Sequence, residues 1–272
     1  AIIMTTIIEA IILGVVQGLT EFLPISSSGH LILAEWTTGW KGELINNLTF
    51  DVALHIGTLT AVLWYFWRDW LLLGKATVNV FRGRAPEYEA RFVWYIALAT
   101  VPAVIVGLLF EHTVETLFRN PLLIAAALIT GSFLMWLADR TSSRERHLGT
   151  MTLSHALFVG VAQAVALLPG ISRSGITISA ALAAGYRRED AARFSFLLST
   201  PVIAGAAVLK VRHITFQGHA AWGCILGTLS SAVVGYLAIR FLIRFLERHS
   251  LNLFIWYRLA LAGAVVLLWF AR

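Results

Sequence analysis

The sequence predicts an all-α polytopic membrane protein, built as an inverted-topology repeat with six transmembrane helices plus two re-entrant helical hairpins. Three observations predict this fold: the composition, the spacing of the apolar stretches, and a motif that occurs twice. Hydrophobic residues occupy 58% of the 272 positions and charged residues only 13%, with a mean hydropathy of +0.77. A soluble domain averages roughly 25% charged residues, so this composition suits a bilayer.

The charge balance indicates a membrane surface rather than a nucleic acid. The net charge of +6 is spread over loops between apolar stretches, where cytoplasmic loops carry their excess of Lys and Arg next to anionic lipid. We therefore expect the lipid bilayer as a partner and no nucleic acid. Cys224 is the only cysteine, which excludes an intrachain disulfide and a cysteine metal site.

The first element is the apolar region 4–35, which is interrupted at Pro24-Ile25-Ser26-Ser27-Ser28-Gly29. Its arms are short for a helix that needs about 20 residues to cross the hydrocarbon core. Non-helical backbone is tolerated at membrane depth only where protein or a watery cavity surrounds it. We therefore expect a re-entrant helical hairpin. Region 152–185 has the same form, interrupted at Pro169-Gly170-Ile171-Ser172-Arg173-Ser174-Gly175.

Each hairpin is followed by three stretches that are long enough, or nearly so, to cross a bilayer. They are Phe50–Trp67, Phe92–Phe110 and Pro121–Ala138 after the first hairpin, and Phe194–Lys210, His219–Ile239 and Leu251–Phe270 after the second.

The connections Arg68–Arg91 and Asp139–His147 are rich in Arg and Lys. Two spans separate them, so both lie on one side, which the positive-inside rule identifies as the cytoplasm. The second hairpin enters after one basic segment and leaves into another, Arg187–Arg193, so it opens toward the cytoplasm. The first hairpin then opens on the opposite face.

The two halves of the chain resemble each other at their hairpins. Gly14-Val15-Val16-Gln17-Gly18 matches Gly160-Val161-Ala162-Gln163-Ala164, and Ile25-Ser26-Ser27-Ser28-Gly29 matches Ile171-Ser172-Arg173-Ser174-Gly175. Three spans per half invert the second copy. We expect a first repeat over 1–140 and a second over 150–272, in one integrated membrane domain. Inverted repeats with broken helices hold their site at the repeat interface, so the two hairpin tips should meet.

The first candidate site cluster centres on Glu21, which shares a helix face with Gln17. An ionisable group in an apolar segment costs about 2.5–3.5 kcal/mol and usually has a function and a partner. A carboxylate hydrogen-bonded only for packing is the alternative. Ser27 is a candidate nucleophile, and His30, three residues on, is a candidate base or orienting donor for it.

Ser26, Ser28 and Gly29 open the second arm of the same hairpin. Free backbone N–H groups and the positive end of a helix favour an anion there. Simple N-capping by serine is the alternative, above all for Ser28.

The second cluster centres on Arg173, an arginine between two apolar arms. Its planar fork is suited to gripping two phosphate oxygens, and further donors come from Ser172, Ser174, Thr177 and the backbone at Gly175. A purely structural ion pair between Arg173 and Glu21 is the alternative; it would still require the two tips to touch.

Together these residues suit the cleavage of a diphosphate, which needs positioning and charge neutralisation. Catalytic roles fall to Ser27, His30, Glu21 and Arg173, and the other serines, Thr177 and both glycines would bind phosphate. Glu21, together with Gln17, could hold a divalent cation that also binds substrate phosphates. A transporter or flippase of a polyprenyl phosphate uses the same architecture, and a structural membrane subunit is a second alternative; a carrier, however, needs no nucleophile.

The sequence resembles the undecaprenyl-diphosphate phosphatase family, also called the bacitracin resistance protein family. The resemblance rests on the segments 17–30 and 169–175 and extends to Val101-Pro102-Ala103, Gly107-Leu108-Leu109-Phe110 and Phe194-Ser195-Phe196-Leu197-Leu198. It covers nearly the whole chain.

The resemblance implies a bacterial plasma-membrane enzyme that removes the terminal phosphate of undecaprenyl diphosphate, recycles the lipid carrier of peptidoglycan synthesis and confers bacitracin resistance. It implies Mg²⁺ or Ca²⁺ as cofactor and a site open to the extracytoplasmic side. Glu21, Ser27, His30 and Arg173 would be essential, supported by Ser26, Ser172 and Thr177. Gln17 departs from members with Glu at that position, which removes a negative metal ligand. The sequence leaves the oligomeric state open, a homodimer included.

Overall fold

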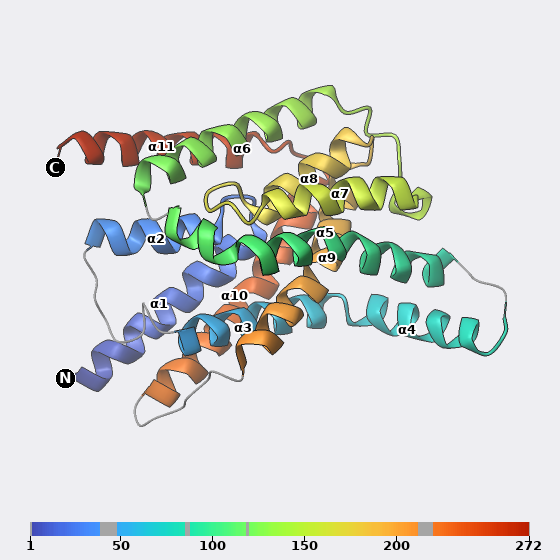
Figure 1. Cartoon of the computed structure of the whole chain (residues 1–272), viewed down its shortest axis with the longest axis horizontal. Coiled ribbons are helices and arrows are strands. Elements are labelled where there is room, and N and C mark those ends of the chain that lie inside the picture. The colour runs from blue at the N-terminus through green and yellow to red at the C-terminus, as the bar shows by residue number, and fades with distance from the viewer. Residues whose placement is uncertain (1, 39–47, 85–87, 118–119, 212–219, 272) are drawn as a thin grey trace.

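The computed structural model describes residues 2–38, 48–84, 88–117, 120–211 and 220–271. These residues form helices, apart from turns, short connections and one isolated bridge between Arg146 and Tyr186. Figure 1 shows α6 and α11 side by side along one edge of the molecule and α1, α3 and α10 together on the other side, with the short helices α7 and α8 between them.

The helices of the first half are α1 (Ile2–Phe22), α2 (Ser27–Thr38), α3 (Leu48–Tyr65), α4 (Trp67–Phe81), α5 (Tyr88–Leu117) and α6 (Pro121–Thr141). The second half begins with a short 3₁₀ helix, η1 (Leu148–Thr150). It continues with α7 (Leu153–Val165), α8 (Arg173–Ala183), α9 (Arg188–Val211), α10 (Ala220–Leu246) and α11 (Asn252–Ala271).

Among the described residues, α5, α6, α9, α10 and α11 are long and apolar enough to cross a membrane, and the pair α3–α4 adds a sixth span if it is counted as one. The chain is therefore an all-helical, multi-pass membrane protein. Its helices match the predicted stretches closely, although His219, the first residue of one predicted span, lies outside the described residues.

Two elements differ from the sequence prediction. The chain bends by 74° after α3 and continues as α4, so part of the predicted loop Arg68–Arg91 is helical. The apolar residues Leu73 and Ala76 of α4 are buried, and packing of this kind stabilises helices beyond their local propensity. Helix α1 has 21 residues, so the first arm of the hairpin is longer than the sequence predicts. The reason is that its largely apolar sequence begins at Ile2.

The breaks between α1 and α2 and between α7 and α8 have the same local structure. Ser26 and Ser172 have positive φ angles of 78° and 74°, a conformation that is costly for a residue with a side chain. The hydroxyl of each serine accepts a hydrogen bond from the backbone N–H three residues later, at Gly29 (3.3 Å) and Gly175 (3.2 Å). Each serine thereby caps the following helix.

The matched glycines of the two halves also occupy equivalent places. Gly14 on α1 packs against α10, where an added Cβ would lie 2.5 Å from the carbonyl oxygen of Gly227. Gly160 on α7 packs against α5, where an added Cβ would lie 2.7 Å from the Cα of Ala99. Backbone-to-backbone contact of this kind is typical of small residues in membrane helix pairs, and it explains why both halves have glycine here.

We expect Gly160→Val to destabilise the protein by about 1–3 kcal/mol, because the backbone of α5 cannot yield to an inserted side chain as a flexible side chain could. Gly107→Val on α5 is the matched control, since an added Cβ there meets nothing within 4 Å. Thermal unfolding of both variants in detergent measures the effect, and equal unfolding temperatures would contradict it.

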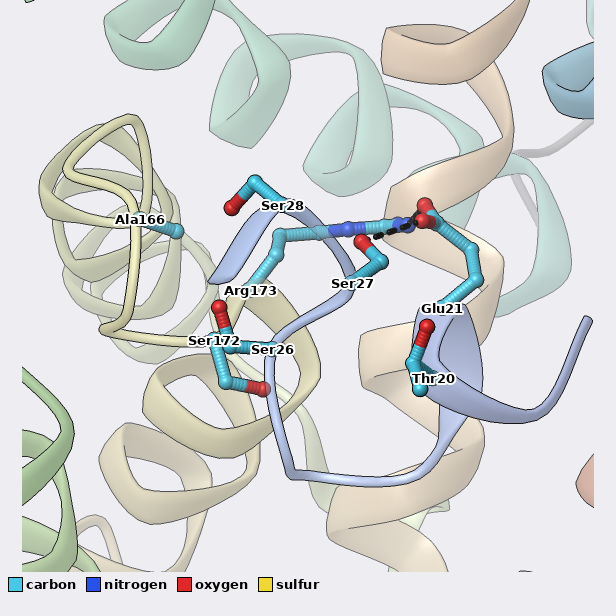
Figure 2. Close-up of a pocket in the computed structure, with 8 residues that line it drawn as sticks. All are labelled: Thr20, Glu21, Ser26, Ser27, Ser28, Ala166, Ser172 and Arg173. Carbon is cyan, nitrogen blue, oxygen red and sulfur yellow. Dashed lines mark hydrogen bonds and ion pairs between the residues drawn. The ribbon is translucent and has the colours of Figure 1, made fainter. Parts of the chain in front are cut away.

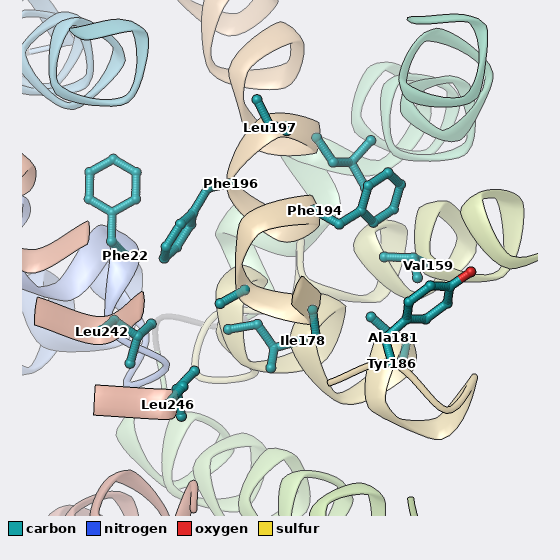
Figure 3. Close-up of a cluster of buried hydrophobic side chains, with 14 of the residues drawn as sticks. Phe22, Val159, Ile178, Ala181, Tyr186, Phe194, Phe196, Leu197, Leu242 and Leu246 are labelled. Atoms are coloured by element: carbon teal, nitrogen blue, oxygen red, sulfur yellow. The ribbon is translucent and has the colours of Figure 1, made fainter. Parts of the chain in front are cut away.

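The hydrophobic core fixes the end of α1 next to the site. Phe22 is completely buried and meets Phe196 of α9 edge to face, with ring centroids 5.5 Å apart. Figure 3 shows Phe22 and Phe196 facing each other, with Leu242 and Leu246 of α10 nearby. Because Phe22 directly follows Glu21, this packing determines where that carboxylate points.

Candidate functional site

A cavity of about 60 Å³ lies between the two helix breaks. A volume of this size has room for roughly four water molecules, or for one phosphoryl group. Polar side chains from both halves of the chain face it (Figure 2): Thr20, Glu21, Ser26, Ser27 and Ser28 from the first half, and Ser172 and Arg173, with Ala166, from the second.

An ion pair between Glu21 and Arg173 joins the two halves inside this cavity. Both side chains are largely buried, with 7% of Glu21 and 16% of Arg173 exposed. The other carboxylate oxygen of Glu21, Oε2, accepts hydrogen bonds from Ser27 Oγ (2.8 Å) and Gln17 Nε2 (2.9 Å). The tips therefore meet, as the sequence analysis expected.

Two further hydrogen bonds hold the tips together. The backbone N–H of Gly170 donates to Ser26 Oγ (3.1 Å), and Ser174 Oγ donates to the carbonyl of Leu23 (3.1 Å). Ser26 therefore caps its own helix and also binds the opposite tip. Serine hydroxyls and backbone groups thus link the two breaks at points other than the ion pair.

His30 differs from the sequence expectation, because both of its ring nitrogens have partners other than Ser27. Its Nδ1 lies 2.7 Å from the carbonyl oxygen of Ser26, and its Nε2 lies 2.7 Å from the hydroxyl of Tyr257 on α11. The ring also stacks on Tyr257, with centroids 5.6 Å apart. The spacing explains this arrangement: His30 comes four residues after Ser26, so its side chain folds back onto that carbonyl.

The phosphate-binding residues named from the sequence fall into two groups. Ser26, Ser28 and Ser172 line the cavity, and the exposed Ser28 points its hydroxyl away from Glu21 in Figure 2.

Four residues of that set do not line the cavity. The amides of Gly29 and Gly175 are capped by serine hydroxyls. Ser174 binds a carbonyl of the opposite tip. Thr177 donates to the carbonyl of Arg173 (2.7 Å) and lies 2.6 Å from Ser195 Oγ on α9. Their contacts are those of residues that shape the two hairpins and pack them together.

The cavity offers one carboxylate, Glu21, as an oxygen ligand for a divalent cation, and Gln17 is bound to it from outside the cavity lining. Within the described residues, no group of three or more His, Cys, Asp and Glu side chains could hold a metal ion. The buried Oε1 of Gln17, however, has no hydrogen-bond partner there, and it lies on the same side chain that donates to Glu21. An amide oxygen and one carboxylate suit Mg²⁺ where substrate phosphates supply further ligands.

Sequence reasoning missed two residues that contact the site, Tyr257 and Arg258 of α11. Arg258 is completely buried and donates to carbonyls of both tips, Pro24 and Gly170. A signal was present for Arg258, since an arginine inside an apolar span is as costly as Arg173. Nothing in the sequence distinguishes Tyr257 from an interfacial aromatic.

Comparison with known proteins agrees with the motifs. The model of the family described as bacitracin resistance protein BacA matches residues 10–264. A relative in Pelotomaculum thermopropionicum is 46% identical over 268 residues, covering 98% of both chains. One in Moorella thermoacetica is 47% identical over 267 residues, covering 98% of this chain and 99% of its own. Another, in Geobacter metallireducens, is 48% identical over 265 residues, covering 96% of this chain and 97% of its own.

All three relatives carry the name undecaprenyl-diphosphatase. The resemblance to this family is confirmed, and the family match over residues 10–264 includes the segments 17–30 and 169–175 that carry it. The chain belongs to the bacitracin resistance protein BacA family.

Proposed function

We propose that this protein hydrolyses undecaprenyl diphosphate to undecaprenyl phosphate and inorganic phosphate. This reaction recycles the lipid carrier of envelope synthesis and confers bacitracin resistance. The observation that carries the proposal is the hydrogen bond from Ser27 to Glu21 beside the Arg173 guanidinium, in a cavity of phosphoryl size. The substrate comes from the name that the relatives share.

The chemistry follows from these contacts. Ser27 Oγ attacks the terminal phosphorus, its proton passes to Glu21, and undecaprenyl phosphate leaves with the electrons of the broken P–O bond. Glu21 passes this proton to the departing undecaprenyl phosphate. It then accepts a proton from the water that attacks the phosphoserine and returns it to Ser27 Oγ as inorganic phosphate leaves. Ser27 Oγ donates a hydrogen bond to Glu21 Oε2. This contact supports Glu21, rather than His30, as the group that receives the proton.

Arg173 stabilises the phosphate charge in this reaction. Its guanidinium already contacts Glu21, so the positive charge is held at the cavity before substrate arrives and only a small rearrangement is needed to stabilise the phosphate. When the substrate phosphate enters, the guanidinium exchanges part of its contact with the carboxylate for the phosphate oxygens, and Glu21 becomes free to accept the proton of Ser27.

Glu21 and the unpartnered Oε1 of Gln17 would hold the divalent cation, Mg²⁺ or Ca²⁺. A bound cation would supply Lewis-acid neutralisation of the diphosphate. Gln17 also donates to Glu21, which fixes the rotamer of that carboxylate. The protein's own contribution is therefore to orient Glu21 and to exclude bulk water from it.

The site belongs to an inverted repeat in the bacterial plasma membrane and opens to the extracytoplasmic side. The equivalent packing of Gly14 and Gly160 supports the repeat. The orientation is supported by Asp139 at the end of α6, which binds Arg188 of α9 and the backbone of Leu251 before α11. The basic segments after α6, before α9 and before α11 thus lie at one end of the molecule, as cytoplasmic loops should.

We expect the purified protein in detergent to release inorganic phosphate from undecaprenyl diphosphate in a cation-dependent manner. Chelation by EDTA should lower the rate by at least about 100-fold, since the cation contributes several kcal/mol of charge stabilisation. Re-addition of Mg²⁺ or Ca²⁺ should restore it. A phosphate-release assay with synthetic substrate measures the effect.

A transporter or flippase predicts a different result from the same preparation. A carrier binds the lipid phosphate and needs neither the Ser27 hydroxyl nor phosphate release. Well-folded protein that binds undecaprenyl phosphate, releases no phosphate from the diphosphate and moves lipid between leaflets of a vesicle would overturn the hydrolase and favour the carrier.

A further inference from the structure

Helix α11 carries two adjacent residues that contact the hairpins: Arg258 binds both helix breaks, and Tyr257 binds His30 of α2. Arg258 has no exposed surface, although it is charged. Its guanidinium donates to carbonyl and hydroxyl oxygens of three segments: Pro24 O (3.4 Å), Gly170 O (2.8 Å), Leu128 O (3.1 Å) and Ser132 Oγ (3.0 Å).

The two tip carbonyls that Arg258 contacts are equivalent positions of the two repeats. Pro24 precedes Ser26 by two residues, and Gly170 precedes Ser172 by two residues; both serines are the positive-φ caps of the breaks. One guanidinium therefore bridges the same carbonyl of both hairpins. A guanidinium can bind both carbonyls because its N–H groups point in several fixed directions. The compact ammonium of a lysine cannot reach all these acceptors.

Helix α6 leaves room for this bridge at Gly131. A Cβ at that position would lie 2.8 Å from the carbonyl oxygen of Ile171 and closer still to Arg258 Nη2. The guanidinium therefore occupies the space that the side chain of any other residue at position 131 of α6 would take. The close fit fixes its position between α6 and both tips.

Stability by itself does not account for a charge in this place. The hydrogen-bond partners of Arg258 in the described part of the chain are neutral oxygens, while Glu21 is already paired with Arg173. Burying a charge among neutral groups costs more than burying an apolar side chain of similar volume. What this costly arginine provides is a set of hydrogen bonds that fixes the positions of both tips.

Tyr257 acts on His30 in a similar way. In a neutral His30 ring, Nδ1 donates a hydrogen bond to the carbonyl of Ser26, which leaves the lone pair at Nε2. That nitrogen then accepts a hydrogen bond from the hydroxyl of Tyr257. The stacking of the two rings adds to this contact. Tyr257 thereby fixes both the tautomer and the plane of the imidazole.

We propose that Tyr257 and Arg258 are positioning residues of the hydrolytic site. Arg258 holds the two tips together, so that Glu21, Ser27 and Arg173 face one cavity. Tyr257 orients His30, whose Nδ1 binds the carbonyl of Ser26 and so positions the backbone next to Ser27. This inference rests on the proposed hydrolysis.

The first experiment compares Arg258→Gln and Arg258→Lys with the wild type. We expect kcat to fall about 100-fold in Arg258→Gln, the scale of a misplacement of about 1 Å, with KM changed only a few-fold. Arg258→Lys should recover part of kcat, because an ammonium reaches some of the acceptors. Gly263→Ala on the same helix is the control, since an added Cβ there meets nothing within 4 Å.

Gly131→Ala keeps the charge of Arg258 but displaces its guanidinium and presses on the carbonyl of Ile171 in the second tip. We expect it to lower kcat nearly as much as Arg258→Gln, and the double variant to be little worse than either single variant. Additive losses, or a Gly131→Ala enzyme with wild-type kcat, would show that the location of the guanidinium is irrelevant and overturn the proposal.

Tyr257→Phe keeps the ring and removes the hydroxyl. Its kcat should fall about 10-fold at unchanged KM and unchanged unfolding temperature, while Tyr236→Phe on α10 should match the wild type. A wild-type kcat in Tyr257→Phe would overturn the role of Tyr257.

Hydrogen exchange of segments 23–29 and 168–175 tests the bridge without any substrate. In Arg258→Gln both segments should exchange faster than in the wild type, with other helices unchanged. Wild-type exchange and wild-type kcat in a folded Arg258→Gln protein would overturn this inference while the hydrolase stands. A wild-type protein that releases no phosphate would instead remove the proposed function, and the exchange result would still decide whether Arg258 holds the tips.

Discussion

Replacing Arg173 with alanine is expected to lower kcat/KM for phosphate release by about 10³–10⁵-fold, the range over which a positioned arginine contributes to phosphoryl transfer. The guanidinium is the cationic group that lines the cavity described above, and it is oriented by Glu21 before substrate binds. Its removal has a second consequence, because Glu21 stays buried without its cation. A buried, unpaired carboxylate resists ionisation, so the acceptor of the Ser27 proton is lost as well.

The ion pair between Arg193 and Asp69 provides the matched control. It joins an arginine of α9 to a carboxylate of α4, away from the cavity, and 46% of the arginine side chain is exposed. Arg193→Ala should keep wild-type activity and lose at most about 1 kcal/mol of stability. Arg173→Lys should recover little, because an ammonium cannot grip two phosphate oxygens in the plane of a guanidinium. Arg173→Ala with near wild-type turnover would remove the phosphate clamp from the mechanism.

Replacing Ser27 with alanine is expected to lower kcat by about 10³-fold, because the nucleophile is lost and water must replace it. The hydroxyl donates to Glu21 at 2.8 Å, a contact of the kind that activates a serine for attack. Ser28→Ala is the matched control: its hydroxyl lines the same cavity but is exposed and points away from Glu21. That variant should keep at least about a third of the wild-type rate, as expected for a weak phosphate contact.

The covalent step is tested separately. Rapid quenching of wild-type enzyme with labelled substrate should trap phosphate on a peptide that contains Ser27, and a two-step transfer should retain the configuration at a chiral phosphorus. Inverted configuration without a trapped intermediate would show that water attacks directly. Ser27 would then act only by hydrogen bonding, and its replacement should cost closer to 10²-fold.

The hairpins illustrate what local sequence determines. Pro24 and Pro169 precede runs of small polar residues, and a helix cannot continue through such a run at membrane depth. Glu21 and Arg173 are each too costly in an apolar segment to be without a partner. These are local properties of composition and chain direction, and they identify the family, the multi-pass helical fold and the two residues that meet in the cavity.

Apart from the pair Glu21–Arg173, only the tertiary structure decided which side chains bind one another. The sequence placed His30 next to Ser27, yet the serine hydroxyl binds Glu21, and the imidazole binds the carbonyl of Ser26 and Tyr257. Tyr257 and Arg258 lie more than 200 residues from the first tip along the chain, and no periodicity encodes that distance. The bend before α4 likewise depends on packing against other helices. Local patterns determine the conformation of a segment and the free-energy cost of placing a charged side chain in it. The partner of that side chain depends on how distant helices pack in three dimensions.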